Sequence, residues 1–287
     1  MVQEILKQIT IYQIKHRVKQ SYMQQIGKFI LLNPHELGRY LNTVSVVRVI
    51  KLVQNHHTYI PNYSHFNGNN HFSLLQGMEN AHLQRGFSEI AQNLTTFPDG
   101  TTAICRDMNK IPAGIMGANQ YGICIENLGN FDVGGDSMAD SQKATIVSLN
   151  ATLCKKFKLT PSTDSIVYHH WYDLNSGQRT NGTGTTKSCP GTNFFGGNTV
   201  EAANDNFIPL ITDQLKTIVQ QSTSSAPSQH GTVNTPILNV RSGPGTNNSV
   251  LSQLTQGTVV AIYAELQGWY QIDAGQKWVS KDFIDLA

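Results

Sequence analysis

One segment of the chain gathers residue types that could bind a metal ion. Between Tyr168 and Phe195 lie the pair His169-His170, a Gly/Thr-rich loop and a Lys-Ser-Cys-Pro-Gly run at residues 187–191. Imidazole and thiolate are ligands that zinc prefers, and a catalytic zinc takes three protein ligands and keeps one position open. His170 and Cys189 would supply two of these three ligands.

The third ligand must come from a distant part of the chain. A second pair, His56-His57, follows the apolar run 46–55, which predicts a buried strand. Side chains alternate along a strand, so only one of two adjacent histidines can face a given site. Taken singly, a Cys before Pro-Gly is more often a buried thiol than a ligand, and a His pair is more often polar filler. Two His pairs and this Cys together favour a metal site.

The elements around these residues predict an α/β domain, a central mixed β-sheet flanked by helices. Strands are expected at 90–96 and 101–106, on either side of a Phe-Pro-Asp-Gly turn, and again at 121–128 and 166–168. Amphipathic periodicity predicts helices at 137–157 and 199–221, the second bent at Pro209. A helical stripe from Phe72 to His82 is more typical of core than of a site, so His82 is expected to pack.

Glu126 is an unexpected residue in the strand at 121–128, because its neighbours are apolar. Its carboxylate must either lie on the exposed face of the sheet or be buried beside a partner such as a metal-associated water.

Composition excludes several classes of function. With a net charge of +2 and 14% charged residues, the 287-residue chain has no basic surface for nucleic acid. Its plentiful Gly, Asn, Thr and Ser suit a neutral polar ligand such as a glycan. No apolar run approaches the roughly 18 residues of a membrane helix, and residues 1–32 lack a signal peptide's apolar region, so a soluble, cytoplasmically made chain is expected. The four cysteines are too few for a disulfide framework; buried thiols are expected, with a Cys105–Cys124 disulfide as the alternative.

A change of composition near residue 222 divides the chain. Ser, Thr, Ala and Pro over 222–229 predict a linker. Beyond it, closely spaced short strands with Gly-rich turns predict a small all-β barrel at 230–287. The expected organisation is a segment of unknown role at 1–33, where helices are allowed, an α/β catalytic domain at 34–221, the linker, and the barrel.

Residues 35–220 resemble the zinc-dependent N-acetylmuramoyl-L-alanine amidases, a family that includes bacteriophage lysins and the peptidoglycan recognition proteins. The resemblance rests on five motifs: His-His-Thr at 56–58, Gly-Phe-Ser-Glu-Ile at 86–90, Gly-Ile-Cys-Ile-Glu at 122–126, His170, and Lys-Ser-Cys-Pro-Gly at 187–191. It implies a Zn²⁺ ion held by His56, His170 and Cys189.

The same resemblance implies hydrolysis of the amide between N-acetylmuramic acid and L-alanine in bacterial peptidoglycan. Zinc would polarise the carbonyl and acidify the attacking water. Glu126 would take the proton of that water, and Lys187 would direct its ammonium at the developing oxyanion. Many lysin members carry a catalytic Tyr at the position of Gln92. A Gln cannot act as a base, so Glu126 is expected to be the catalytic base.

The C-terminal segment resembles a bacterial SH3-like domain, through an Asn-Val-Arg-Ser-Gly-Pro-Gly run at 239–245 and the segments around Trp269 and Trp278. Such domains commonly bind cell-wall peptidoglycan, although these tryptophans can equally be barrel core. The combination implies a phage or prophage endolysin that reaches the wall without a signal peptide. The alternatives are an autolysin, a recognition module without catalysis, whose members typically lack the Cys ligand, and an adaptor for proline-rich peptides, which the 239–245 run disfavours.

Overall fold

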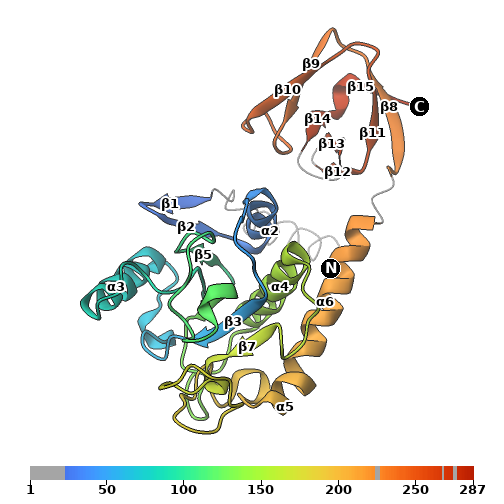
Figure 1. The fold of residues 1–287 in the computed structure, drawn as a ribbon. Coiled ribbons are helices and arrows are strands. Elements are labelled where there is room, and N and C mark those ends of the chain that lie inside the picture. The colour runs from blue at the N-terminus through green and yellow to red at the C-terminus, as the bar shows by residue number, and fades with distance from the viewer. Residues whose placement is uncertain (1–22, 224–226, 267, 274–276) are drawn as a thin grey trace, which may run out of the picture. The chain divides into compact units, whose positions relative to one another are not determined.

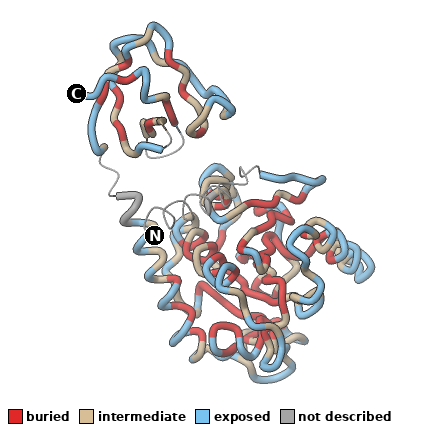
Figure 2. The backbone as a smooth tube through the Cα atoms, turned by 180° about the vertical axis from the view of Figure 1, so that it is seen from behind, coloured by how far each residue is buried: buried red, intermediate tan, exposed pale blue. Residues whose placement is uncertain are grey.

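The computed structural model describes residues 23–223, 227–266, 268–273 and 277–287, which divide into two compact units, one up to Leu215 and one from Lys216 onward. The first unit is an α/β domain with a mixed sheet between helices, and the second consists of β-strands after the end of its first helix (Figure 1). Buried residues run through the interior of each unit (Figure 2). None of the described helices combines the length and the hydropathy that crossing a bilayer requires.

A seven-stranded mixed sheet forms the centre of the first unit, as the sequence predicted. Its strand order is β1-β2-β5-β4-β6-β3-β7. The neighbours β4, β6, β3 and β7 are parallel, whereas β1, β2, β5 and β4 pair antiparallel. In chain order the strands are β1 Gln24–Ile26, β2 Phe29–Leu32, β3 Leu52–His57, β4 Leu94–Thr96, β5 Thr102–Ile104, β6 Gly122–Asn127 and β7 Ile166–Tyr168.

The first two strands lie in a segment where the sequence pattern allowed helices. Gly27, at a φ of 58°, turns the chain between β1 and β2, and β2 then pairs with β5. Phe29 and Leu31 face one core of the domain, whereas Leu32 faces the other, which is the two-residue alternation of a strand. The sheet therefore starts ahead of residue 34, where the sequence suggested that the domain begins. Residues 1–22 of the expected N-terminal segment lie outside the described residues.

Helices cover both faces of the sheet, and each face has its own apolar core. On one face α2 (Pro34–Thr43) and α4 (Asp140–Phe157) bury Leu41 and Leu149 against the strands. On the other face α3 (His71–Gln84) buries Leu75 and Met78. Asn55 of β3 and Asn150 of α4 exchange two amide hydrogen bonds of 2.9 and 3.2 Å, which fix the strand that leads to the site. All four cysteines are buried and free, so the alternative disulfide is not formed.

The helix expected at 199–221 is interrupted before Pro209. A short α5 (Val200–Ala202) leads into a π-helical turn over Ala203–Phe207, and α6 (Ile208–Thr223) follows. Proline has no N–H to donate and its ring crowds the preceding turn, which accounts for an irregular turn at this place.

The second unit contains two antiparallel sheets around one core. The strand orders are β10-β9-β14-β13-β12 and β11-β8-β15. Trp278 is buried, whereas Trp269 is half-buried. The first strand begins at Gln229, at the end of the expected linker; the strands are β8 Gln229–Val233, β9 Ile237–Arg241, β10 Val250–Thr255, β11 Val259–Ile262, β12 Ala264–Leu266, β13 Trp269–Gln271, β14 Trp278–Ser280 and β15 Ile284–Leu286.

Candidate metal centre and active site

The parallel strands β3 and β6 end at the same edge of the sheet and bring two predicted site residues side by side. His56 of β3 is the register partner of Glu126 of β6. The next residue, His57, turns away, and its Nδ1 accepts the backbone N–H of Phe131 at 3.1 Å. The alternation of the strand thus directs His56, and not His57, toward the other candidate ligands.

His169, rather than the expected His170, lies beside His56. Strand β7 ends at Tyr168 and the chain enters a 3₁₀ turn over His169–Trp171. The rings of His56 and His169 are 4.9 Å apart between centroids. His170 instead donates from Nδ1 to the carbonyl oxygen of Lys187 at 2.7 Å. The prediction of His170 at this place is corrected to His169, because the turn that follows β7 decides which of the two side chains points to the sheet edge.

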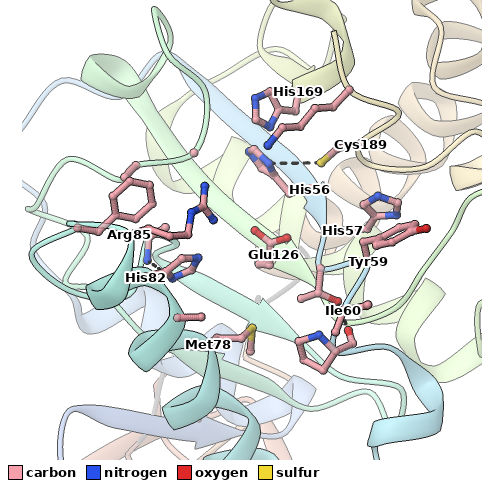
Figure 3. A pocket seen from close by; sticks show the side chains of 18 of the residues that line it. His56, His57, Tyr59, Ile60, Met78, His82, Arg85, Glu126, His169 and Cys189 are labelled. Atoms are coloured by element: carbon pink, nitrogen blue, oxygen red, sulfur yellow. Dashed lines mark hydrogen bonds between the residues drawn. The ribbon is translucent and has the colours of Figure 1, made fainter. Parts of the chain in front are cut away.

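Cys189 completes a group of three candidate ligands. One ligand atom from each of His56, His169 and Cys189 can be chosen so that all lie within 4.8 Å of one another. The Cys189 sulfur is 3.5 Å from Nδ1 of His56, and Figure 3 shows the three side chains converging. The backbone N–H of His170 donates to the Cys189 carbonyl at 2.7 Å, which ties the Cys loop to the end of β7.

The electrostatics of this group suit a cation that binds neutral imidazole. Burial, with the neighbouring His169 and Lys187, holds the pKa of His56 well below its usual 6.5. Burial and Lys187 lower the pKa of His169 to about 4. Burial and the nearby Glu126 raise the pKa of the Cys189 thiol, so a metal ion is what would favour its thiolate.

A buried polar atom without a partner supports the same conclusion. Among the described residues, nothing hydrogen-bonds to Nε2 of His56, although this atom is removed from solvent. Buried polar atoms are almost always satisfied, and exceptions mark places where a ligand, ion or water belongs. Two imidazoles and one thiolate are also a donor set that zinc takes in proteins. The residues present therefore fit a zinc ion.

Glu126 and Lys187 are the acidic and basic groups next to the candidate ligands. Burial raises the pKa of Glu126 to about 8, although the ammonium of Lys187 acts to lower it. Of the two possibilities that the sequence left open, the carboxyl group thus lies half-buried in a pocket and not on the open face of the sheet. A carboxyl group with a pKa in this range can exchange protons near neutral pH. Lys187 is exposed and lines the same pocket.

Comparison with known families identifies the family to which this fold belongs. A family model described as N-acetylmuramoyl-L-alanine amidase matches residues 47–192, just over half of the chain. The chain belongs to this family. The amidase hydrolyses the amide bond between N-acetylmuramic acid and L-alanine in bacterial peptidoglycan. A second model, described as a bacterial SH3 domain, matches residues 237–285, which identifies the all-β unit of the amidase.

Several solved structures are similar to the amidase at low sequence identity. Endolysine N-acetylmuramoyl-L-alanine amidase LysCS from Clostridium intestinale URNW is 22% identical with a TM-score of 0.38, over 51% of this chain and 78% of that chain. LysC of the same organism is 20% identical with a TM-score of 0.38, over 62% and 88%. Drosophila PGRP-LB is 18% identical with a TM-score of 0.42, over 56% and 82%. A search of curated proteins finds no significant match.

The candidate ligands of the amidase open onto a cavity of about 700 Å³. One wall comes from the C-terminal half of α3 and the residues that follow it, including His82 and Arg85. Another comes from the segment after β3, where Tyr59 and Ile60 are 52% and 67% exposed. Figure 3 shows Arg85 and Tyr59 on opposite sides of Glu126. The cavity therefore offers a cationic side and an apolar side around one carboxyl group.

Gln92 is a core residue of the amidase. Its side chain is fully buried and its Nε2 donates to Oγ1 of Thr95 at 3.0 Å. It is not among the residues that line the cavity. The position expected to carry a Tyr in many lysins is thus occupied here by a buried side chain that does not line the cavity.

Sequence reasoning missed part of the cavity wall. His82 packs as expected, since its Nδ1 accepts the N–H of Ala91 at 3.1 Å, but it also lines the cavity. Arg85 follows it by three residues, one helical turn further along the same face of α3. This three-residue spacing could have predicted that Arg85 lies on the same face as His82. For His169 against His170 the sequence offered none, because the end of β7 decides between them.

Proposed function

We propose that the amidase works with a zinc ion held by His56, His169 and Cys189, with Glu126 and Lys187 as its catalytic residues. The observation that carries this proposal is the convergence of two imidazoles and one thiol within 4.8 Å at the strand end that also carries Glu126. When bound there, zinc would polarise the scissile carbonyl and lower the pKa of the attacking water.

The side chains of the amidase have separate tasks in this scheme. Glu126 takes the proton from the attacking water and delivers it to the nitrogen of L-alanine as the amide C–N bond breaks. Lys187, an exposed cation that lines the cavity, stabilises the negative charge that develops on the carbonyl oxygen. The carbonyl of Lys187 accepts the hydrogen bond from His170, so His170 positions the backbone of this residue.

We also propose that the amidase acts as an endolysin whose SH3 domain binds the cell wall. The support is the pairing of an amidase unit with a bacterial SH3 unit in one chain. The proposal places the chain at the wall after release from the cell in which it is made, with peptidoglycan as the partner of both units. An autolysin with the same activity would have the same two units.

Mass spectrometry of digested peptidoglycan tests the proposal. Purified sacculi are incubated with the protein, with the chelator-treated protein, and with the chelator-treated protein after zinc is restored. New amino termini on L-alanine, intact glycan strands, loss of product with chelator and recovery with zinc are the expected results. New reducing sugar ends, or cleavage that the chelator does not reduce, would overturn the proposal. Binding without cleavage would favour a recognition module.

A further inference from the structure

We propose that Arg85 binds a carboxylate on the peptide side of the substrate and thereby determines which stem peptides the amidase cleaves. This inference rests on the amidase activity of the site, and it extends that activity to a substrate class. Three features carry it: a rigid backbone turn at the end of α3, a guanidinium with no ion-pair partner among the described residues, and the distribution of charge in the cavity.

A Schellman motif fixes the place of Arg85. Helix α3 ends at Gln84, Arg85 is its C-cap, and Gly86 follows with a φ of +83°. The N–H of Phe87 donates to the carbonyl of His82 at 3.0 Å, and the N–H of Gly86 donates to that of Leu83 at 2.9 Å. Both hydrogen bonds of the motif are therefore present, so the backbone at Arg85 is held in one conformation.

Aromatic contacts support the Arg85 side chain within this turn. The guanidinium carbon lies 5.2 Å from the centroid of the Phe87 ring, which is a cation–π contact. The Phe87 ring in turn lies 5.5 Å from the ring of His82. A planar guanidinium that rests on a ring keeps its N–H groups directed outward, and Arg85 lines the cavity.

Arg85 differs from the nearby Arg106 in having no counterion in the described part of the chain. Among the described residues no carboxylate forms an ion pair with it, whereas the nearby Arg106 lies 3.7 Å from Glu89. In the described lining of the cavity, Glu126 carries the one carboxyl group, and Lys187 carries a second positive charge. Electrostatic complementarity thus favours a substrate that brings its own negative charge to the α3 wall.

His82 provides a second hydrogen-bond donor beside Arg85. Nδ1 of His82 accepts the N–H of Ala91, so a neutral His82 carries its proton on Nε2. His82 and Arg85 are three residues apart on α3, which places them on one face of the helix. Together they present two N–H donors to the cavity, a suitable arrangement for the two oxygens of a carboxylate.

The chemistry of the substrate identifies the ligand of Arg85 as part of the peptide. The lactyl carboxyl group of N-acetylmuramic acid is consumed in the scissile amide, so the muramoyl side is neutral. The peptide side retains carboxyl groups, the first of which is on the residue after L-alanine. One residue spans at most about 3.6 Å, so this carboxylate lies within a few ångströms of the bond that is cut. The apolar Tyr59 and Ile60 on the other side of Glu126 suit the neutral sugar.

A pair of soluble substrates tests the inference. One is an N-acetylmuramoyl tripeptide whose second residue has a free α-carboxylate, and the other has that carboxylate converted to the primary amide. The wild-type zinc-loaded protein is expected to cleave the acid with a higher kcat/KM than the amide. Arg85→Gln should lower kcat/KM about 10- to 100-fold for the acid and less than about 2-fold for the amide, because charge-assisted hydrogen bonds have this strength. Arg85→Lys should retain part of the preference, since it keeps the charge and loses the planar fork.

Lys143→Gln provides the control. Lys143 is an exposed residue of α4 that does not line the cavity. Its substitution removes one positive charge and should leave the ratio of kcat/KM for the acid to that for the amide unchanged. A melting temperature for each variant shows that it is folded. An Arg85→Gln protein that is folded and loses both substrates equally, or neither, overturns the role of Arg85 and leaves the amidase intact. A wild-type protein that cleaves neither substrate overturns the proposed function itself.

Discussion

His56 and Glu126 are register partners on the parallel strands β3 and β6, so a buried imidazole and a half-buried carboxyl group share one end of the sheet. Burial raises the pKa of Glu126 to about 8 from a usual 4.5. A group that is suited to proton transfer near neutral pH is thereby also a source of instability in the metal-free protein, since ionising it inside the cavity is unfavourable.

Glu126→Gln should therefore abolish turnover and stabilise the metal-free protein. With a folded pKa above the unfolded one, the stability linked to Glu126 is fully present below about pH 4.5 and is lost as the pH rises toward 8. Because Gln does not ionise, the variant does not lose this stability. Its free energy of unfolding at pH 8 should exceed that of the wild-type protein by on the order of 2 kcal/mol. Denaturant unfolding of both chelator-treated proteins at pH 5 and pH 8 measures the difference. If the free energies of unfolding of the two proteins change equally between pH 5 and pH 8, burial does not raise the pKa of Glu126.

The two adjacent histidines at the end of β7 should differ sharply in metal binding. His169→Ala should lower zinc affinity at least about 100-fold, because it removes one of the three proposed ligands, and Cys189→Ser should also weaken it. His170→Ala keeps all three proposed ligands and loses the hydrogen bond to the carbonyl of Lys187, so its zinc content should stay near that of wild type. Competition with a chromophoric chelator measures each affinity. Loss of zinc in His170→Ala with retention in His169→Ala would restore the sequence-based assignment.

Lys187→Met should act on the transition state more than on the ground state. Its ammonium lines the cavity beside the candidate ligands, where an oxyanion would form. Loss of one such donor lowers kcat by about 100-fold, whereas KM should change only slightly. Steady-state kinetics on a soluble muramoyl peptide, with zinc content as a control, separates these effects. An increase in KM at constant kcat would make Lys187 a substrate-binding residue.

Glu89 should make the stability of the first unit sensitive to acid. Burial works to raise its pKa, but Lys110, Arg106 and Lys28 outweigh this and hold the pKa below 4.5. A depressed folded pKa means that the contribution is present above about pH 4.5 and is lost as the pH falls through the folded value. Glu89→Gln should lower the free energy of unfolding at pH 7 by about 1–2 kcal/mol, because Arg106 is buried and loses a counterion.

An exposed ion pair in the SH3 unit supplies the comparison for Glu89. Glu265 lies 2.7 Å from Lys281, with both side chains well exposed, and Glu265→Gln should change stability much less than Glu89→Gln. Unfolding curves at pH 7 and pH 4 for both variants make the test. Equal effects of the two substitutions would mean that the burial of Arg106 contributes nothing to the Glu89 network.

Sequence patterns located the strand ends of this fold better than the orientation of individual side chains. The alternation rule predicted that only one of His56 and His57 faces the site, and the family resemblance selected His56. Strand β3 continues through both residues and directs His56 toward the other candidate ligands. The same rule could not choose between His169 and His170, since the strand stops at Tyr168 and a 3₁₀ turn has a different period. Strand β2 was missed because four apolar residues fit a helix or a strand equally well, and its pairing with β5 is a contact across more than seventy residues.

The cavity wall shows a second limit of sequence patterns. Met78 and His82 form part of an apolar stripe that a helix uses to bury itself, and α3 does bury Met78 in the core. The same stripe continues to Arg85 at the cavity. A helix at the rim of a site packs and binds with adjacent parts of one face, so periodicity alone does not show where the core ends.

Strand β2 affects how this protein can be divided or recombined with others. The family match begins at residue 47, yet Phe29, Leu31 and Leu32 are each at most 8% exposed and belong to the two cores of the amidase unit. A chimaera joined at residue 34 or 47 would leave the edge of β5 unpaired and its apolar neighbours uncovered, which is a template for aggregation. Exchange of catalytic modules between wall-degrading enzymes should therefore place the junction ahead of Gln24.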